Sequence, residues 1–172
     1  MPQILTYMPL DVDANHDFLL AAHRETSRLT FGTTYTDEQI EREIERERNI
    51  SVGVYLNSEI VGLCDVEKRI KKNGESYGWV HFFYLMLELR GQGLGVQLIE
   101  QACRFCRGQG LQNLLLRVGE PNVSAYHFYE RNGFERAPEL DKQGEFAFVK
   151  SIKAQLQKET DKACITQLNM LQ

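Results

Sequence analysis

Apolar positions near the start of the chain recur at the spacing of an α-helix. Between residues 15 and 29 they are Phe18, Leu19, Ala22 and Leu29, which fall on one stripe of a helical wheel. Such a stripe is typical of a helix that packs one side against a core. The pattern therefore predicts an amphipathic helix over residues 15–29.

A second helix is predicted to begin at residue 36, because the sequence TDEQ at residues 36–39 resembles a capping box. Ile40 and Ile44 are its few apolar anchors, and Glu38 and Arg42 have the i,i+4 spacing of an ion pair. The other positions are mostly charged. We interpret this charge as a face turned to solvent.

The middle of the chain shows the composition and alternation of β-strands. Residues 51–56 and 60–69 flank a short polar turn and predict an antiparallel hairpin. Residues 77–87 form a longer, aromatic-rich run with apolar side chains on both alternating sets, as expected for a central strand that is covered on both faces. Residues 4–7 are a candidate first strand.

The second half of the chain alternates helices and strands. Residues 93–107 and 123–131 predict helices, and residues 113–118 and 145–152 predict strands. The predicted order is therefore helices, a hairpin, and then strand–helix–strand–helix–strand. That order is typical of an α/β fold with a central mixed sheet, flanking helices and one parallel crossover.

Composition is that of an ordinary globular protein. Of its 172 residues, we expect 1–152 to form one domain and 153–172 a C-terminal extension, for which a helix is one possibility. The net charge of −4 leaves no basic surplus for nucleic-acid phosphates. No apolar run reaches the roughly 18 residues that cross a bilayer, and residues 1–10 lack the layout of a secretion signal. We therefore expect a cytoplasmic protein with no membrane or nucleic-acid partner.

Cys103 and Cys106 have the CxxC spacing of redox and zinc sites. No second CxxC or paired-histidine cluster completes a metal site in the sequence, so we expect no metal. Both cysteines fall on the apolar face of a predicted helix, with Ile99 and Ala102 one turn earlier. Reduced thiols in the core are the favoured interpretation over a redox pair.

A glycine-rich turn, RGQGLG at residues 90–95, stands between the aromatic strand and the following helix. Glycines let the backbone approach a ligand closely, and the first turn of a helix presents unpaired N–H groups to an anion. A dinucleotide site would need a glycine where the chain has Val96, and a P-loop would need Gly-Lys-Ser/Thr here. Two interpretations of residues 90–95 remain: a phosphate-binding turn of another type, and a plain tight turn without a ligand.

With this turn the chain resembles the GCN5-related N-acetyltransferase (GNAT) superfamily, whose acetyl-CoA motif reads Gln/Arg-x-x-Gly-x-Gly/Ala after a central strand. Arg90, Gly93 and Gly95 match its fixed positions. A second match follows in the expected order, with Asn122 after the next strand, Tyr129 in the next helix, and then a Gly-Phe pair. Two motifs in the right order make the resemblance specific.

The resemblance is specific over residues 79–134 and implies a GNAT-like fold, with two central strands that splay apart to admit the pantetheine of acetyl-CoA. Backbone groups at the end of the aromatic strand should pair with pantetheine, and the glycine turn should hold the pyrophosphate. The cofactor-binding residues implied are Leu85, Met86, Leu87, Arg90, Gly91, Gln92, Gly93, Leu94, Gly95, Asn122 and Tyr129. Many relatives have a proline where this chain has Leu87, a departure of little consequence for backbone contacts.

Acetyl transfer by direct attack needs a neutral amine, alignment with the thioester, a donor to the oxyanion and a proton for the departing thiolate. By resemblance, Tyr129 is the catalytic donor of that proton to the coenzyme A sulfur. Packing in the core beside Phe128 is the structural alternative for Tyr129. Tyr126, one turn earlier, is the nearest substitute as a donor.

His81 is the candidate catalytic base, because an acceptor amine is mostly protonated at neutral pH. It lies on the aromatic strand in a set that alternates with Phe83 and Leu85, where a lone imidazole is conspicuous. A satisfied core histidine and deprotonation through water both stay open, and Glu75 and Tyr77 are weaker candidates. The other three histidines have no supporting context.

The sequence does not identify the acceptor. By resemblance, residues 28–39 shape its pocket, and residues 31–35 offer either a small polar-aromatic cleft or an ordinary loop. Small-molecule and protein amines both fit, and O-acetylation or a longer acyl donor stays open. We expect an acetyl-CoA-dependent N-acetyltransferase, with a non-catalytic CoA-ester-binding or regulatory domain as the alternative. Homodimers are common among relatives and are a possibility here.

Overall fold

A seven-stranded mixed sheet forms the centre of the computed structural model, which describes residues 3–152. Its strand order is β1-β2-β3-β4-β5-β7-β6, and neighbours pair antiparallel except for the parallel pair β4 and β5. The strands are β1 (Thr6–Pro9), β2 (Val52–Leu56), β3 (Glu59–Ile70), β4 (Ser76–Leu85), β5 (Asn113–Gly119), β6 (Glu135–Arg136) and β7 (Glu145–Ser151). The predicted mixed sheet with one parallel crossover is therefore confirmed. The predicted C-terminal extension lies outside the described residues.

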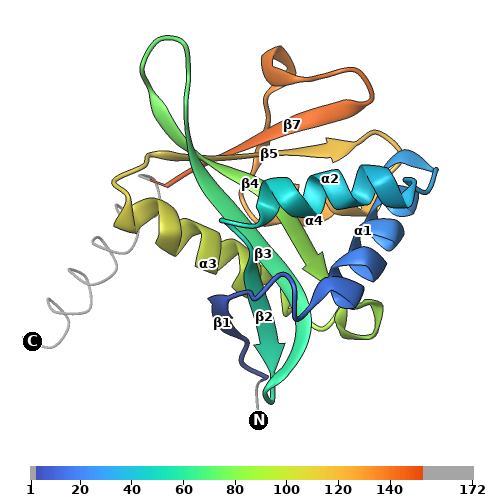
Figure 1. The fold of residues 1–172 in the computed structure, drawn as a ribbon. Coiled ribbons are helices and arrows are strands. Elements are labelled where there is room, and N and C mark those ends of the chain that lie inside the picture. Colours follow the sequence, from blue (N-terminus) through green and yellow to red (C-terminus); the bar gives the residue numbers. More distant parts are fainter. Residues whose placement is uncertain (1–2, 153–172) are drawn as a thin grey trace, which may run out of the picture.

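Helices pack on both faces of the sheet (Figure 1). One buried cluster joins the first two helices to the sheet, and a second cluster joins the other two to its opposite face. The helices are α1 (His16–Phe31), α2 (Asp37–Glu47), α3 (Gly95–Gly108) and α4 (Val123–Arg131), and 3-10 turns cover Leu87–Leu89 and Pro138–Leu140. The 3-10 turn at Leu87 ends β4 two residues earlier than predicted.

Helix α2 begins with the predicted capping box. The Gln39 N–H donates to the Thr36 hydroxyl at 3.3 Å, and the Thr36 N–H donates to the Gln39 side chain at 2.8 Å. Ile40 and Ile44 are buried as expected, with at most 2% of their surface exposed. The remaining positions of α2 are mostly charged. Ile40 and Ile44 therefore hold this helix against α1 and the sheet.

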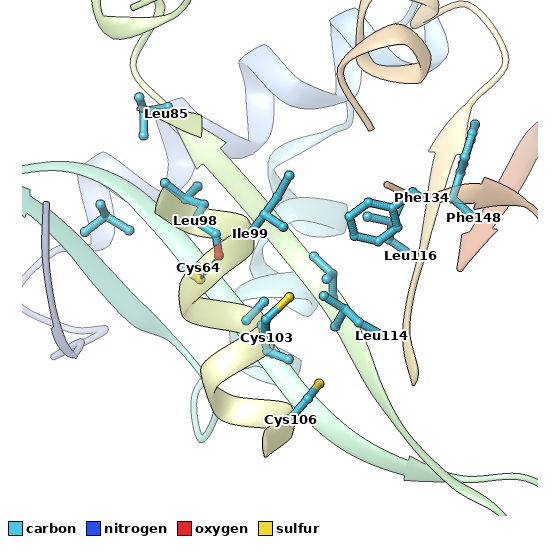
Figure 2. Close-up of a cluster of buried hydrophobic side chains, with 14 of the residues drawn as sticks. Cys64, Leu85, Leu98, Ile99, Cys103, Cys106, Leu114, Leu116, Phe134 and Phe148 are labelled. Atoms are coloured by element: carbon cyan, nitrogen blue, oxygen red, sulfur yellow. Dashed lines mark hydrogen bonds between the residues drawn. The ribbon is translucent and has the colours of Figure 1, made fainter. Parts of the chain in front are cut away.

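The core between α3 and the sheet contains both cysteines of the CxxC pair. Figure 2 shows Cys103 and Cys106 on α3 facing Leu114 on β5. Both thiols are free and buried, and burial raises the pKa of Cys106 to about 12. They therefore act as packed apolar groups. The Cys106 sulfur packs directly on Gly78 of β4, because a Cβ at this glycine would lie only 2.3 Å from the sulfur.

The sheet opens between its two parallel strands. β4 and β5 pair only where Gly78 lies opposite Leu114 and Trp79 opposite Leu115. Figure 1 shows the two strands diverging after this point. Within residues 3–152, the edge of β4 that faces β5 has no strand partner beyond Trp79, which leaves backbone groups on that side for another molecule.

A β-bulge at His81 corrects one expectation from the sequence. Asp65 of β3 pairs with Phe82, and Val66 pairs with Val80, which leaves His81 as the extra residue. His81 and Phe82 consequently both face α1 and α2, and Phe83 lies with the opposite core. His81 does not share a face with Phe83, because the bulge shifts the alternation by one residue.

Candidate active site

A cavity of about 440 Å³ spans both faces of the sheet at the gap between β4 and β5, and we call it the through-sheet cavity. Its walls come from α1, α2, β3, β4, β5, α4 and the segment before β7. Three residues singled out in the sequence line it together, namely His81, Asn122 and Tyr129. The candidate acid and the candidate base therefore share one cavity, although they belong to different elements.

Tyr129 of α4 is half-buried in an aromatic cluster. Its ring centre lies 5.3 Å from that of Phe128 and 5.3 Å from that of Phe134, both in edge-to-face geometry. Burial raises the pKa of its hydroxyl above the usual value of 10.0, so the phenol stays protonated at physiological pH. The hydroxyl has no hydrogen-bond acceptor among the described residues. It can therefore donate a proton or a hydrogen bond to a ligand in the cavity.

The hydroxyl of Tyr126 is already used by the protein. It donates to the backbone carbonyl of Gly119 at 2.9 Å and to that of Glu120. These bonds tie α4 to the end of β5, and they give Tyr126 a structural role. Tyr129 is consequently the stronger candidate donor of the two.

Asn122 is the N-cap of α4. Its side-chain oxygen accepts from the Ala125 N–H at 3.4 Å and from the Ser124 hydroxyl at 3.2 Å. Capping accounts for an asparagine at this position without a ligand. Its expected contact with the cofactor stays a prediction.

His81 belongs to a buried group of ionisable side chains on the α1–α2 side of the cavity. Its Nε2 lies 3.3 Å from one carboxylate oxygen of Glu47, and the other oxygen lies 3.0 Å from Nε2 of His23. The His23 ring stacks on Phe82 with their centres 4.4 Å apart. On the far side of His81, Nδ1 lies 3.8 Å from Glu67. Glu47 therefore bridges two histidines that come from α1 and β4.

The pairing changes the proton affinities of the group. Burial alone would raise the pKa of Glu47, but hydrogen bonds from His23 and His81 outweigh it and hold that pKa below its usual value. The hydrogen bond to Glu47 in turn raises the pKa of His81 against the opposing effect of burial. An imidazole with a raised pKa is a stronger base, which suits acceptance of a proton.

Glu47 and His23 were missed in the sequence. We interpreted the charge of the second helix as solvent-facing and found no context for His23, but Glu47 is only 2% exposed and His23 only 6%. The signal was helical spacing, because Glu47 follows the buried Ile44 by three residues and His23 follows the buried Leu19 by four. Glu75, a weaker candidate base, instead pairs with Lys71 in an exposed turn.

The glycine turn has the geometry of an anion site. Gly91 and Gly93 have φ of 74° and 79°, and a Cβ on either would meet no atom within 4 Å. The backbone N–H groups of residues 92–96 have no backbone or side-chain acceptor in the described part of the chain. They lie just before and within the first turn of α3, where the helix dipole favours an anion.

Other glycine-turn residues also serve the fold. A Cβ on Gly95 would lie 2.9 Å from Phe128, so this glycine lets α4 pack on the start of α3. Arg90 turns away from the turn: it donates to the Leu85 carbonyl at 2.7 Å and pairs with Glu25 of α1 at 2.7 Å. Its guanidinium is thus held by α1, and a contact between Arg90 and a phosphate stays a prediction.

The three residues expected to contact pantetheine lie at the end of β4, and they differ in whether their backbone groups already have partners in the protein. The Met86 N–H donates to Val61 of β3 at 2.9 Å, and the Met86 carbonyl accepts from Leu89 at 3.0 Å. Met86 therefore has both backbone groups satisfied within the protein. The carbonyls of Leu85 and Leu87 also accept hydrogen bonds, from the Arg90 side chain at 2.7 Å and from the Arg90 N–H at 3.1 Å. The N–H groups of these two residues are therefore the remaining candidates for backbone contacts to a ligand.

The side of the cavity near residues 31–35, where the acceptor is expected, is part apolar and part charged. Phe31 and Tyr35 stack with ring centres 5.5 Å apart, which places two of the residues expected at 31–35 in its wall. On the sheet, the guanidinium carbons of Arg69 and Arg117 lie 4.6 and 5.0 Å from the ring centre of Trp79. Within residues 3–152 no cluster of His, Cys, Asp and Glu is arranged to hold a metal ion, and no helix has the length and hydropathy needed to span a bilayer.

Residues 17–134 match the family model of the acetyltransferase (GNAT) family. The chain is similar to glucosamine 6-phosphate N-acetyltransferase 1 of Dictyostelium discoideum, with 29% identity over 140 residues that cover 77% of this chain and 85% of the relative. It is also similar to N-alpha-acetyltransferase 30 of Schizosaccharomyces pombe, with 26% identity over 84 residues. That match covers 49% of this chain and about half of the relative's length, 56%.

The fold is likewise similar to that of solved acetyltransferases. The PaiA N-acetyltransferase of Thermoplasma acidophilum, solved in complex with coenzyme A, superposes with a TM-score of 0.62 and 21% identity. The match covers 86% of this chain and 99% of that chain. At this identity the likeness concerns the fold, and it agrees with the mixed sheet flanked by helices.

Proposed function

Because the chain belongs to the GNAT family of acetyltransferases, we propose that it transfers the acetyl group of acetyl-CoA to an amine bound in the through-sheet cavity. The observation that carries this proposal is the cavity itself. It connects the α1–α2 side of the sheet, where His81 lies, with the α4 side, where Tyr129 lies. Two substrates that enter from opposite sides can therefore meet at the gap between β4 and β5.

The cofactor end of the site is formed by backbone groups. The free N–H groups of residues 92–96 suit the pyrophosphate of acetyl-CoA, and the unpaired edge of β4 suits the amides of pantetheine. An N–H group on this open edge would also stabilise the negative charge that develops on the thioester oxygen. These contacts need no particular side chain, which agrees with the expectation that Leu87 in place of a proline has little consequence for the backbone contacts.

The transfer follows direct attack. The amine nitrogen forms a bond to the thioester carbon as the carbon–sulfur bond breaks, and the amine proton passes to His81. Tyr129 gives its proton to the departing sulfur, and the raised pKa of Tyr129 ensures that this proton is present. The phenolate regains a proton from water after the thiol leaves. Alignment of the two substrates can lower the barrier by roughly 7–11 kcal/mol, so no covalent enzyme intermediate is required.

The acceptor is a small-molecule or protein amine. The two relatives named above differ in this respect, since one is named for glucosamine 6-phosphate and the other for an α-amine. The cavity offers aromatic rings and both signs of charge, which suits a polar acceptor of moderate size. A panel of amines is therefore the appropriate search.

Thermal unfolding with acetyl-CoA, CoA, NAD and ATP tests the proposal first. A ligand at 100 times its Kd stabilises the folded state by about 2.7 kcal/mol, which for a chain of this size raises Tm by about 5–10 °C. We expect this shift with acetyl-CoA and CoA alone, followed by thiol release with at least one amine among peptides, amino sugars and polyamines. No shift with either CoA compound would overturn the cofactor assignment. A shift without turnover of any amine would favour the non-catalytic alternative.

A further inference from the structure

The carboxylate of Glu47 has no role in the reaction as described so far, although it is the most deeply buried acid of the cavity wall. It reaches this position because α2 carries it on the same stripe as Ile40 and Ile44. An isolated buried carboxylate is costly, and here two imidazoles offset that cost. Each carboxylate oxygen is taken by one Nε2, from His23 and from His81.

This geometry determines which nitrogen of His81 is free. A carboxylate accepts hydrogen bonds and cannot donate them, so the Nε2 that faces Glu47 must carry a hydrogen. In neutral His81, Nδ1 is then the nitrogen with the lone pair. Nδ1 is buried and has no hydrogen-bond partner among the described residues. An unused acceptor on a residue that lines a cavity can receive a proton, and because Nδ1 is shielded from solvent, the acceptor amine reaches it only when the cavity wall beside His81 opens.

We propose that Glu47 is a positioning residue for the transfer: it holds the hydrogen of His81 on Nε2 and leaves Nδ1 to receive the proton of the acceptor amine. This inference rests on the proposed function and deepens it. In the step, one amine proton moves to Nδ1 as the nitrogen–carbon bond forms, and Nε2 keeps its hydrogen. The imidazolium returns the proton to water after the product leaves.

The surroundings of His81 stabilise that imidazolium. Glu47 faces Nε2, and Glu67 of β3 lies 3.8 Å from Nδ1, so each nitrogen has a carboxylate on its side. Arg69 of β3 opposes the charge, but its guanidinium is paired with Glu67 and lies over Trp79. The ionisable groups around the Glu47–His81 pair are, from α1, His23 and, from β3, Asp65, Glu67 and Arg69.

His23 supports the pair from the other side. The His23 ring stacks on Phe82 with an interplanar angle of 1°. The bulge places Phe82 on the same face of β4 as His81. The Nε2 of His23 takes the second oxygen of Glu47, so the carboxylate cannot rotate away from His81 without losing a hydrogen bond. The bulge, the stack and the bridge therefore fix His81 from three elements.

NMR titration of the His81 imidazole in the full chain, with pH–rate profiles beside it, tests the proposal. The variant is Glu47→Gln, and the matched control is Glu45→Gln, an exposed acid of the same helix that pairs with Arg48 outside the cavity. We expect Glu47→Gln to lower the pKa of His81 by about one unit and to move the acidic limb of kcat/KM to lower pH by the same amount. Glu45→Gln should change neither.

An unchanged His81 titration in folded Glu47→Gln would overturn the proposal. If that variant does not fold, the nitrogen shifts of the unmodified protein decide instead. A neutral His81 with its hydrogen on Nε2 supports the proposal, and a hydrogen on Nδ1 overturns it. His81→Gln distinguishes failure of the Glu47 proposal from failure of the proposed acetyl transfer. If the rate and pH profile of this variant match those of the unmodified protein, His81 is not the base. The proposed role of Glu47 in the transfer is then overturned. In that case acetyl transfer itself still stands.

Discussion

Tyr129 shows at the residue scale how packing prepares a side chain for chemistry. Its ring is held by Phe128 and Phe134, the residue lines the through-sheet cavity, and its hydroxyl has no acceptor among the described residues. The same burial that makes it a core aromatic raises its pKa and preserves its proton. The packing role and the donor role considered for Tyr129 are thus compatible.

Tyr129→Phe should lower kcat by about 10²-fold or more, because general-acid assistance to the departing thiolate is lost. Binding of acetyl-CoA should stay nearly unchanged, since the ring and its contacts remain. Calorimetry and steady-state kinetics measure the two quantities. Tyr126→Phe is the matched control, as it removes a hydroxyl that bonds to the backbone. Unchanged turnover in Tyr129→Phe would place the proton donor elsewhere.

Asp65 is the second instructive residue, because it is fully buried and close to Glu47. Burial, and then the charge of Glu47, raise its pKa well above the usual value, against hydrogen bonds from Val52 N–H and the Ser51 hydroxyl. A carboxyl group with a raised pKa in the folded state stabilises the fold only while it is protonated. Its contribution is therefore complete at low pH and is lost as pH rises through the folded-state pKa.

Asp65→Asn should consequently become more stable than the unmodified protein as pH increases, with Tm differing by about 2–4 °C for each kcal/mol. The asparagine oxygen can still accept from the Val52 N–H, and its NH2 group can donate to the Ser51 hydroxyl. Asp141→Asn is expected to show the opposite trend, because Arg136 lowers the pKa of Asp141 to about 2. That carboxylate stabilises the fold above pH 4 and loses its effect below. Parallel Tm–pH curves for Asp65→Asn and the unmodified protein would contradict the raised pKa.

At the scale of single elements, the glycine turn and α2 differ in how well they could be predicted. The turn was recognised because its glycines, at Gly91 and Gly93, are needed for left-handed backbone that other residues rarely adopt. The start of α2 was recognised from its capping box, a local pattern. The burial of Glu47 at its end was not, since charge in a helix usually faces solvent and only the partner histidines reverse that expectation.

Gly93→Asp should weaken acetyl-CoA binding by tenfold or more, because it puts a negative charge beside the N–H groups that would hold the pyrophosphate. Gly74→Asp is the matched control. Gly74 also has a positive φ, 85°, and open space around it, but it lies in the β3–β4 turn. Both variants carry the same backbone cost and should lose similar stability. Equal affinity for acetyl-CoA in the two variants would remove the turn from the cofactor site.

At the scale of the whole molecule, the site depends on how α1 meets the sheet. A Cβ on Gly119, at the end of β5, would lie 2.1 Å from the carbonyl oxygen of Thr30. Thr30 and the next residue, Phe31, line the through-sheet cavity. The close approach of β5 and α1 therefore determines the width of the acceptor side.

Gly119→Ala should force α1 away from β5, which costs about 1–3 kcal/mol and raises KM for the acceptor more than it lowers acetyl-CoA affinity. Thermal unfolding and kinetics with both substrates varied measure these effects. Gly108→Ala at the end of α3 is the control, since no described atom outside the adjoining helix backbone lies within 4 Å of its Cβ position. A stable Gly119→Ala protein with unchanged KM would show that the contact is not limiting.

The sequence by itself determined the order of elements, the fold class, the glycine turn and the isolated imidazole of His81, and its resemblance to the GNAT superfamily supplied the candidate Tyr129. These depend on local signals, namely helical and strand periodicity, capping, glycine dihedrals and motif spacing, which operate over a few residues. For the same reason the free, buried state of Cys103 and Cys106 was correctly predicted.

Only the tertiary structure decided which groups meet. The bulge at His81 depends on the register between β3 and β4, and it moved this side chain to the face opposite Phe83. The pairing of His81 with Glu47 and His23 joins three elements, so no local pattern encodes it. The sequence specifies which side chains are present. Packing between distant segments determines which of them lie close together and how deeply they are buried, and these two properties determine their pKa values and their hydrogen-bond partners.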